Sequence, residues 1–277
     1  MESAATTAPW VIVGCGYTGA YLARALAGRR IPVTLTRRDP DAAAELARSL
    51  GAPARTADLA DPASLAGLVP AGAVVACLAP PGPDPAGELR NLLDASHGAA
   101  RLVYVSSTGV YAPGGGAWVD EGWPIAPATD AGRARALAEA ALADSPVPWI
   151  ALRAAGIHGP GRKLADRIRA GTYRVIGDGT THVSRIHVVD LVSAILAAGT
   201  SSAAGFVNVA DDDPAPIGEV ADTIAARLGV PPPPRVPASS VSPELAGMLT
   251  ADRRISNRRL KEELGVVLRH PSWRDGI

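Results

Sequence analysis

The chain has 277 residues, of which 47% are hydrophobic and 19% charged, and its formal net charge at pH 7 is zero. This profile is typical of a globular protein with one large α/β domain and a smaller lobe, or with two modest domains. The neutral balance excludes the basic field that attracts nucleic acids or anionic membranes, so we expect neither as a partner.

The cysteines and the first residues of the chain bear on where in the cell we expect the protein to be. Cys15 and Cys77 form no C-x-x-C pair and no zinc-type spacing, which favours a reducing cytoplasm over a disulfide framework, and we expect no metal site. Residues 1–9 contain neither a basic segment nor an apolar one, so we expect no signal peptide. No apolar run reaches the roughly 18 residues that span a bilayer.

The first half of the chain alternates apolar strands with alanine-rich helices. Apolar runs bounded by turn residues indicate strands, and apolar residues at helical spacing indicate helices. The pattern predicts, in chain order, a strand at 10–13, a helix at 18–28, a strand at 33–36, a helix at 41–50, strands at 54–57 and 73–79, a helix at 88–97, a strand at 101–107, a helix at 131–143 and a strand at 149–153. Continuous apolar strands separated by helices predict a doubly wound parallel sheet of the Rossmann type in the α/β class.

The second half is less regular. It predicts helices at 188–198, 217–228 and 255–264, a strand at 206–209 and a stiff extended connector at 231–234. We expect residues 8–160, with 185–212 returning to them, to form a dinucleotide-binding domain. We expect residues 161–184 and 213–277 to form a small C-terminal substrate-binding lobe.

The glycine pattern after the first strand indicates the cofactor. Gly14, Gly16 and Gly19 form G-x-G-x-x-G between an apolar strand and an amphipathic helix, which is the context this motif requires. Gly14 allows the tight turn, Gly16 lets the backbone approach a pyrophosphate, and Gly19 lets the helix pack close to the strand. Tyr17 and Thr18 open the helix, whose free N–H groups and dipole favour an anion.

The end of the second strand indicates which dinucleotide binds. Chains that bind NAD usually place an acid there, but this sequence has Arg37 and Arg38. Two guanidinium groups suit a 2′-phosphate by charge and by forked hydrogen bonding, so we expect NADP in preference to NAD. Asp39 follows, and it could cap the next helix or still touch a ribose.

Two later strand ends add candidates for the same cofactor. Asp58 and Leu59 follow the third strand, where they could meet the adenine; Asp58 could equally cap the next helix. Leu78 and Ala79 end the fourth strand at the carboxyl edge, where open α/β sheets bind ligands.

Several further segments carry a family resemblance. They are Val-Ser-Ser-Thr-Gly-Val-Tyr at 105–111, Leu-Arg at 152–153 with Gly-Ile-His-Gly-Pro-Gly-Arg at 156–162, Arg-Ile-His-Val-Val-Asp-Leu at 185–191, Phe-Val-Asn-Val at 206–209, and the segments 257–260 and 271–277. With the glycine motif they resemble the extended and atypical short-chain dehydrogenase/reductases, also called the NAD-dependent epimerase/dehydratase family. The resemblance implies a Rossmann domain with a small C-terminal lobe over the active site, and a possible homodimer.

The resemblance also implies a Ser/Thr, a Tyr and a Lys as catalytic residues, and this chain departs from that set. Thr108 matches the Ser/Thr, but the pattern Y-x-x-x-K aligns with Ala131 at the tyrosine and Arg135 at the lysine. Alanine has no ionisable proton, whereas Arg135 keeps a positive charge that can bind ribose hydroxyls. His158, whose side chain could instead pack in its loop, and Tyr111, which is mostly structural in relatives, are the candidate substitutes for the proton donor.

These residues predict an NADP-dependent oxidoreductase acting on a small-molecule carbonyl, alcohol or imine. The alternatives are a sensor or regulatory protein that binds NADP(H) without turnover, which the altered catalytic residues favour, and an epimerase or lyase that uses the nucleotide transiently. The substrate itself is not encoded in any local pattern.

Overall fold

The computed structural model describes residues 8–276, so most of the segment examined for a signal peptide, residues 1–7, lies outside the described residues. The chain divides into two compact units. Of the described residues, unit 1 comprises 8–106, 137–152 and 192–206, and unit 2 comprises 107–136, 153–191 and 207–276. The contacts thus group 107–136 and 153–160 with the C-terminal residues, whereas the sequence assigned them to the cofactor domain; the predicted domain boundaries stay a proposal.

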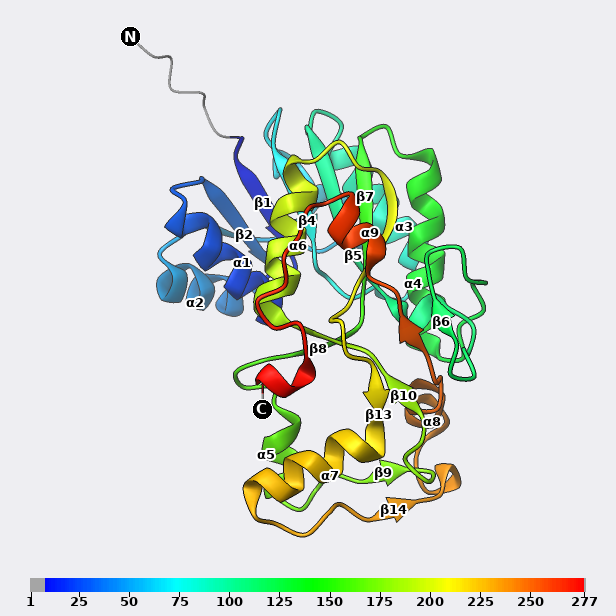
Figure 1. The fold of residues 1–277 in the computed structure, drawn as a ribbon. Helices are drawn as coiled ribbons and strands as arrows, with labels where there is room; N and C mark the ends of the chain where they lie inside the picture. The colour runs from blue at the N-terminus through cyan, green and yellow to red at the C-terminus, as the bar shows by residue number, and fades with distance from the viewer. Residues whose placement is uncertain (1–7, 277) are drawn as a thin grey trace. The chain divides into compact units, whose positions relative to one another are not determined.

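A seven-stranded parallel sheet, most of whose residues belong to unit 1, forms the framework of the fold (Figure 1), which confirms the predicted fold class. Its order is β12-β7-β5-β4-β1-β2-β3. The strands are β1 (Trp10–Val13), β2 (Val33–Arg37), β3 (Ala54–Thr56), β4 (Val74–Cys77), β5 (Arg101–Ser107), β7 (Trp149–Ala154) and β12 (Gly205–Val209). Because the chain runs from β1 toward β3 and then returns to place β4 on the other side of β1, the strand order reverses at β1 and β4. In open α/β sheets a ligand binds outside the carboxyl ends of the strands at this switch point.

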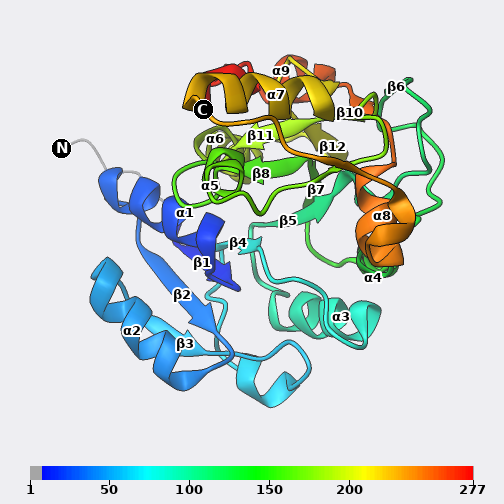
Figure 2. The same ribbon diagram turned by 90° about the horizontal axis from the view of Figure 1, so that it is seen from below.

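Helices cover both faces of the sheet (Figure 2). They are α1 (Tyr17–Gly28), α2 (Pro40–Leu50), α3 (Pro85–Ala95), α4 (Asp130–Ala141) and α6 (Val188–Thr200). Gly19 of α1 approaches Ile12, and Gly199 of α6 approaches Trp10, so these helices cover the face with the even-numbered residues of β1. Val11 and Val13 point to the other face and join a core cluster with leucines of α3. Strands buried on both sides explain the unbroken apolar runs in the sequence.

Unit 2 consists of short elements around two smaller cores. Its helices are α5 (Leu164–Arg169), α7 (Ile217–Leu228), α8 (Pro243–Leu249) and α9 (Arg258–Glu262), and its two-stranded sheets pair β6 (Trp118–Val119) with β15 (Arg254–Ile255), β8 (Gly156–His158) with β11 (Arg185–His187), β9 (Val175–Ile176) with β14 (Arg235–Val236), and β10 (His182–Val183) with β13 (Ala215–Pro216). One core packs α5 and α7 around Tyr173, Val175 and Trp273. The other surrounds Tyr111.

Two predicted helices start three residues away from their position in the structure, whereas the other predicted helices differ by at most two residues at either end. The helix predicted at 88–97 begins at Pro85, because the Asp84 carboxylate caps it by accepting the N–H of Gly87 at 3.0 Å. The helix predicted at 255–264 is wrong in its first turn: Ile255 belongs to β15, and α9 starts only after Asn257. Ile255 is buried as a strand residue of β15. In the sequence it is the nearest apolar residue before Leu260 and Leu264, whose spacing is that of a helix, so the pattern extends the predicted helix too far.

Candidate functional site

The glycine loop of unit 1 is held in a conformation that only glycine adopts without strain. Gly14 has φ +77°, and a Cβ there would lie 2.6 Å from the Cα and the backbone nitrogen of Ala79, at the end of β4. Its N–H donates to Thr36 Oγ1 at 3.2 Å. Gly19 packs α1 against β1, since a Cβ there would lie 3.0 Å from Cys15 Sγ. The predicted roles of these two glycines therefore have a geometric basis.

The third glycine has no clash to avoid. A Cβ on Gly16 would find no atom nearer than Arg37 Nη1 at 3.7 Å, an ordinary contact. Gly16 is also the N-cap of α1; among the described residues no side chain caps this helix, and its first turn contains no acid. Tyr17 and Thr18, both half-buried, form that first turn. A positive helix end with a cationic side chain beside it suits a pyrophosphate, so these residues fit the anionic part of a dinucleotide.

Cys15 takes no part in acid–base chemistry on this loop. It is buried, and burial raises the pKa of its thiol to about 11, although Arg37 and Arg24 act in the opposite direction. The thiol therefore stays protonated and packs between β1 and α1.

Two arginines lie at the end of β2, and the acid that follows them caps the next helix. Arg37 is half-buried and Arg38 exposed. Asp39, the first acid after the strand, is occupied as the N-cap of α2, where its Oδ1 accepts the N–H of Ala42 at 2.7 Å. Of the two readings of Asp39, the structure supports the cap.

The ends of β3 and β4 frame the same edge of the sheet. Asp58 uses its Oδ1 to accept the N–H of Ala60 at 3.0 Å, which makes a local turn; the cap of the following 3-10 helix is Asp61. Leu59 and Leu78 are half-buried, as is Ala79, whose backbone lies against Gly14. Leu78 and Ala79 thus lie at the switch point, while the roles of Asp58 and Leu59 toward adenine remain proposals.

Unit 2 contains a pocket of about 640 Å³. Thr108, the candidate Ser/Thr of the catalytic set, lines it from the turn after β5, where Ser107 Oγ accepts the N–H of Gly109. The apolar lining includes Ile157, Leu164, Val183, Ile217, Met248, Leu249 and Ile255, and the charged lining consists of Arg162, Lys163, Arg167, Arg185 and Arg253 against Asp166 and Asp252. Five cationic side chains against two acids make this a positively charged pocket with an apolar wall.

Tyr111 lies in a buried polar cluster. It is 0% exposed, its hydroxyl donates to Asn208 Oδ1 at 2.7 Å, and Arg153 Nη1 donates to that hydroxyl at 3.0 Å. Tyr111 is not among the residues that line the pocket. This placement favours the structural reading of Tyr111 over the role of proton donor.

The segment aligned with the tyrosine and lysine begins α4. Ala131 is exposed and Arg135 half-buried. The N–H groups of Asp130 and Ala131 donate to the two carboxylate oxygens of Glu244, at 2.7 and 3.1 Å, so a side chain of α8 caps the start of α4. Neither Ala131 nor Arg135 lines the pocket.

His158 lines the pocket from β8, but its imidazole is hardly protonated at neutral pH. Burial, with the nearby charges of His187, Arg185, His270 and Lys163, lowers the pKa of His158 to about 4. The imidazole is therefore neutral at pH 7 and holds no spare proton to donate as an imidazolium. Its buried Nε2 has no hydrogen-bond partner within the described structure.

Three residues from β11, α6 and the C-terminal segment bring potential metal ligands together. Ligand atoms of His187, Asp190 and His270 lie within 4.8 Å of one another. The Asp190 carboxylate already accepts the N–H groups of Arg269 and His270, at 2.7 and 2.9 Å, and the two imidazole rings stack with centroids 3.7 Å apart. His187 Nδ1 accepts the N–H of Val189, so this cluster anchors the C-terminal segment at the junction of β11 and α6.

Other residues that line the pocket could not be identified from the sequence. Tyr173 is buried beside Arg167, and burial raises the pKa of its phenol. His182 Nδ1 lies 2.9 Å from Asp252 Oδ1, forming a His–Asp pair on the pocket wall. These side chains come from short strands and loops outside the motifs, so only tertiary packing could have identified them.

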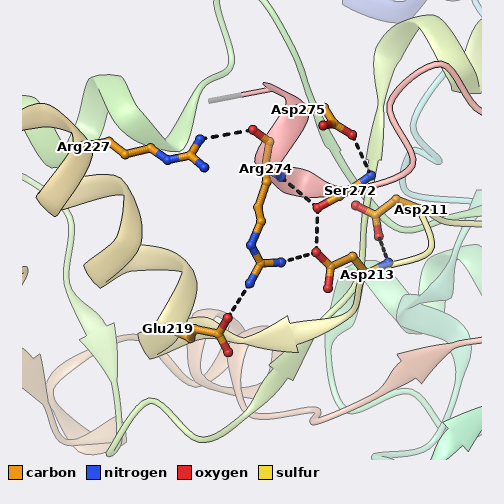
Figure 3. Close-up of polar contacts among 7 residues, drawn as sticks. All are labelled: Asp211, Asp213, Glu219, Arg227, Ser272, Arg274 and Asp275. Carbon is orange, nitrogen blue, oxygen red and sulfur yellow. Dashed lines mark hydrogen bonds and ion pairs between the residues drawn. The ribbon is translucent and has the colours of Figure 1, made fainter.

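Arg274 and several acids form a polar network in unit 2 (Figure 3). Arg274 forms ion pairs with Asp213 and with Glu219, the latter at 2.5 Å, and Ser272 donates to Asp213 at 2.6 Å. Asp211 lies apart from these pairs: it is 1% exposed, and burial raises the pKa of its carboxyl to about 7. The network ties the C-terminal turn to α7.

Comparisons with known proteins agree with this geometry. Residues 14–198 match the family model described as NAD(P)H-binding. A curated protein from Streptomyces, named 3-diazoavenalumate denitrifying reductase, is 37% identical over 197 residues, or 65% of this chain; the chain spans about two thirds of that relative, 64% of its length.

Solved structures match the whole chain. A conserved protein of unknown function from Silicibacter pomeroyi is 32% identical with a TM-score of 0.84, covering 98% of this chain and 96% of the other. A candidate NAD-dependent epimerase/dehydratase from Methylobacillus flagellatus is 26% identical with a TM-score of 0.74, covering 97% and 96%. Among the described helices, none has the length and hydropathy of a membrane span. The chain therefore belongs to the NAD(P)H-binding family, and its structural neighbours are epimerase/dehydratase-like short-chain dehydrogenase/reductases.

Proposed function

We propose that the protein is an NADP-dependent reductase whose substrate takes a hydride without needing a proton from a protein acid. The main support is that each candidate proton donor is unsuited to the role. Alanine aligns with the tyrosine of the family pattern, and Tyr111 is fully buried and hydrogen-bonded. His158 is neutral at pH 7. Reduction of a neutral carbonyl makes an alkoxide and benefits from such a donor. Reduction of a cationic electrophile gives a neutral product and needs no proton donor.

The cofactor part of the proposal is supported by the ends of β1 and β2. The absence of a clash at Gly16 and of a side-chain cap on α1 among the described residues fits a pyrophosphate, and Arg37 with Arg38 fits a 2′-phosphate. The capping role of Asp39 removes the acid that would bind the ribose hydroxyls of NAD. When bound, NADPH supplies a hydride.

Two substrate classes meet the chemical requirement. An iminium ion becomes an amine when its carbon accepts a hydride. A diazonium ion exchanges its C–N bond for a C–H bond and releases N₂, so neither reaction leaves an oxyanion to protonate. The Streptomyces relative is named as a denitrifying reductase of a diazo compound, which supports the second class for this chain.

The proposed residues then have limited tasks. Thr108 orients the reacting group, the cationic lining attracts an anionic group elsewhere on the same substrate, and the apolar wall excludes water. Tyr173 is the tyrosine that lines the pocket and would be the donor if one were required. The sensor hypothesis draws on the same absence of a proton donor, so turnover must decide between the two.

The test is NADPH oxidation, followed at the nicotinamide absorbance, with matched aryl aldehyde, iminium and diazonium substrates. We expect turnover of a cationic substrate at a rate that Tyr173→Phe leaves unchanged. Turnover of the aldehyde alone, abolished in Tyr173→Phe, would show that a protein acid is required. Tight NADPH binding without oxidation by any of the three would support the sensor.

A further inference from the structure

A second, small cavity of about 30 Å³ lies in unit 2. Four of its lining residues, His158, Lys163, Leu164 and Arg185, also line the large pocket. The cavity is closed at the back by α7 and by Trp273, which is 3% exposed. Its volume suits one or two water molecules or one small polar group of a ligand.

The residues around this cavity carry unpaired polar atoms. Eight buried side-chain nitrogen or oxygen atoms of the described residues have no hydrogen-bond partner, and three of them belong to its lining: His158 Nε2, Arg185 Nη1 and Trp273 Nε1. Indole and guanidinium N–H groups can only donate. A buried donor without a hydrogen-bond partner destabilises the folded protein. Several unpaired polar atoms around one small cavity therefore indicate that a ligand supplies the missing acceptor.

The charge around the cavity specifies that acceptor. Arg185 and Lys163 are cationic, and no carboxylate of the described chain lines the cavity. Asp211 acts electrostatically on Arg185, but it does not line the cavity, and burial raises the pKa of its carboxyl to about 7. Its Oδ1 accepts the backbone N–H of Asp213, as Figure 3 shows, so this carboxyl is engaged outside the cavity.

We propose that this cavity binds the carboxylate of an organic acid whose apolar body occupies the large pocket. The proposal rests on the proposed function, because it names the substrate class of the same pocket. Two carboxylate oxygens match the guanidinium fork of Arg185, and the indole N–H of Trp273 and Lys163 supply further donors. A single buried guanidinium and the small volume favour a planar monoanion over a phosphate ester.

The test compares an acid with its neutral isostere. Calorimetry measures the affinity of the protein for trans-cinnamate, cinnamide and phenyl phosphate, in wild type, Arg185→Met, Trp273→Phe and Arg169→Met. Arg169 is the matched control, since it lies exposed on α5 and pairs with Asp166. We expect wild type to prefer cinnamate over cinnamide by about 10- to 100-fold, as for a hydrogen bond to a charged group.

Arg185→Met should abolish that preference, Trp273→Phe should reduce it, and Arg169→Met should keep it. If Arg185→Met fails to fold in a thermal melt, Arg185→Lys, which keeps the charge but loses the fork, should lose part of the preference. Equal affinity for acid and amide, a preference for phenyl phosphate, or a preference unchanged in the Arg185 variant would overturn the proposal. NADPH oxidation is measured separately, so a failure of the proposed reductase function would leave these binding results intact and distinguishable.

Discussion

Replacement of Arg37 by alanine should convert a preference for NADPH into near indifference between NADPH and NADH. The Arg37 guanidinium is half-buried and reaches to 3.7 Å from the position of a Cβ on Gly16, so it lies beside the predicted phosphate site. A hydrogen bond to a charged group contributes roughly 1.5–3 kcal/mol, which is about a 10- to 150-fold change in affinity. Arg38 is exposed, and exposed ion pairs contribute about 0.2–1 kcal/mol, so Arg38→Ala should cost at most about fivefold.

The assay is a fluorescence titration with NADPH and with NADH on wild type, Arg37→Ala and Arg38→Ala. Arg48→Ala is the control, since this exposed residue of α2 forms an ion pair with Glu45 of the same helix. The affinity for NADH, which has no 2′-phosphate, should change less than about twofold in every variant. Equal losses for both dinucleotides in Arg37→Ala would refute the reasoning, because Arg37 would then hold a group that NAD and NADP share.

Three further predictions concern stability and pH. Gly14→Ala should destabilise the protein more than Gly51→Ala in a thermal melt, since both glycines have positive φ but only the Cβ at Gly14 meets backbone; the excess should be about 1–3 kcal/mol, and equal losses would contradict the clash. Because the folded pKa of His158 is about 4 and its unfolded value about 6.5, the unfolded chain takes up the proton first as pH falls. Stability should therefore decrease from pH 6.5 to 4 by up to about 3 kcal/mol, and His158→Asn should remove that part of the slope in urea titrations. Tyr111→Phe should lower stability by about 1–3 kcal/mol with an unchanged rate of NADPH oxidation, whereas a lost rate in a folded variant would restore Tyr111 as a candidate donor.

The sheet and the cofactor loop could be predicted because their signals are local. The apolar run of β1 and the glycine at 14 lie next to each other in sequence, and the structure keeps the predicted bounds of β1, β5 and α7. The switch point at β1 and β4 then follows from strand order. Caps set the remaining limits: Asp84 starts α3 before its first periodic leucine.

Only part of the pocket could be predicted: Thr108 and His158 lie in motif segments and line it, whereas the other lining residues have no common spacing. Tyr173, His182 and Met248 come from a loop, a two-residue strand and a short helix, and none of them belongs to a motif. α8 is only seven residues long and exposes Met248, so its sequence lacks the apolar periodicity that would have predicted a helix. The neutrality of His158 likewise depends on burial and on neighbours distant in sequence.

The reductase proposal is tested most directly by isotope transfer. NADPH deuterated at its transferable position is incubated with the protein and an aryl diazonium acid, and the product is analysed by mass spectrometry. We expect one deuterium at the carbon that lost nitrogen, with one NADP⁺ formed per product. A product without the label, or NADPH left unoxidised while it stays bound, would contradict the account.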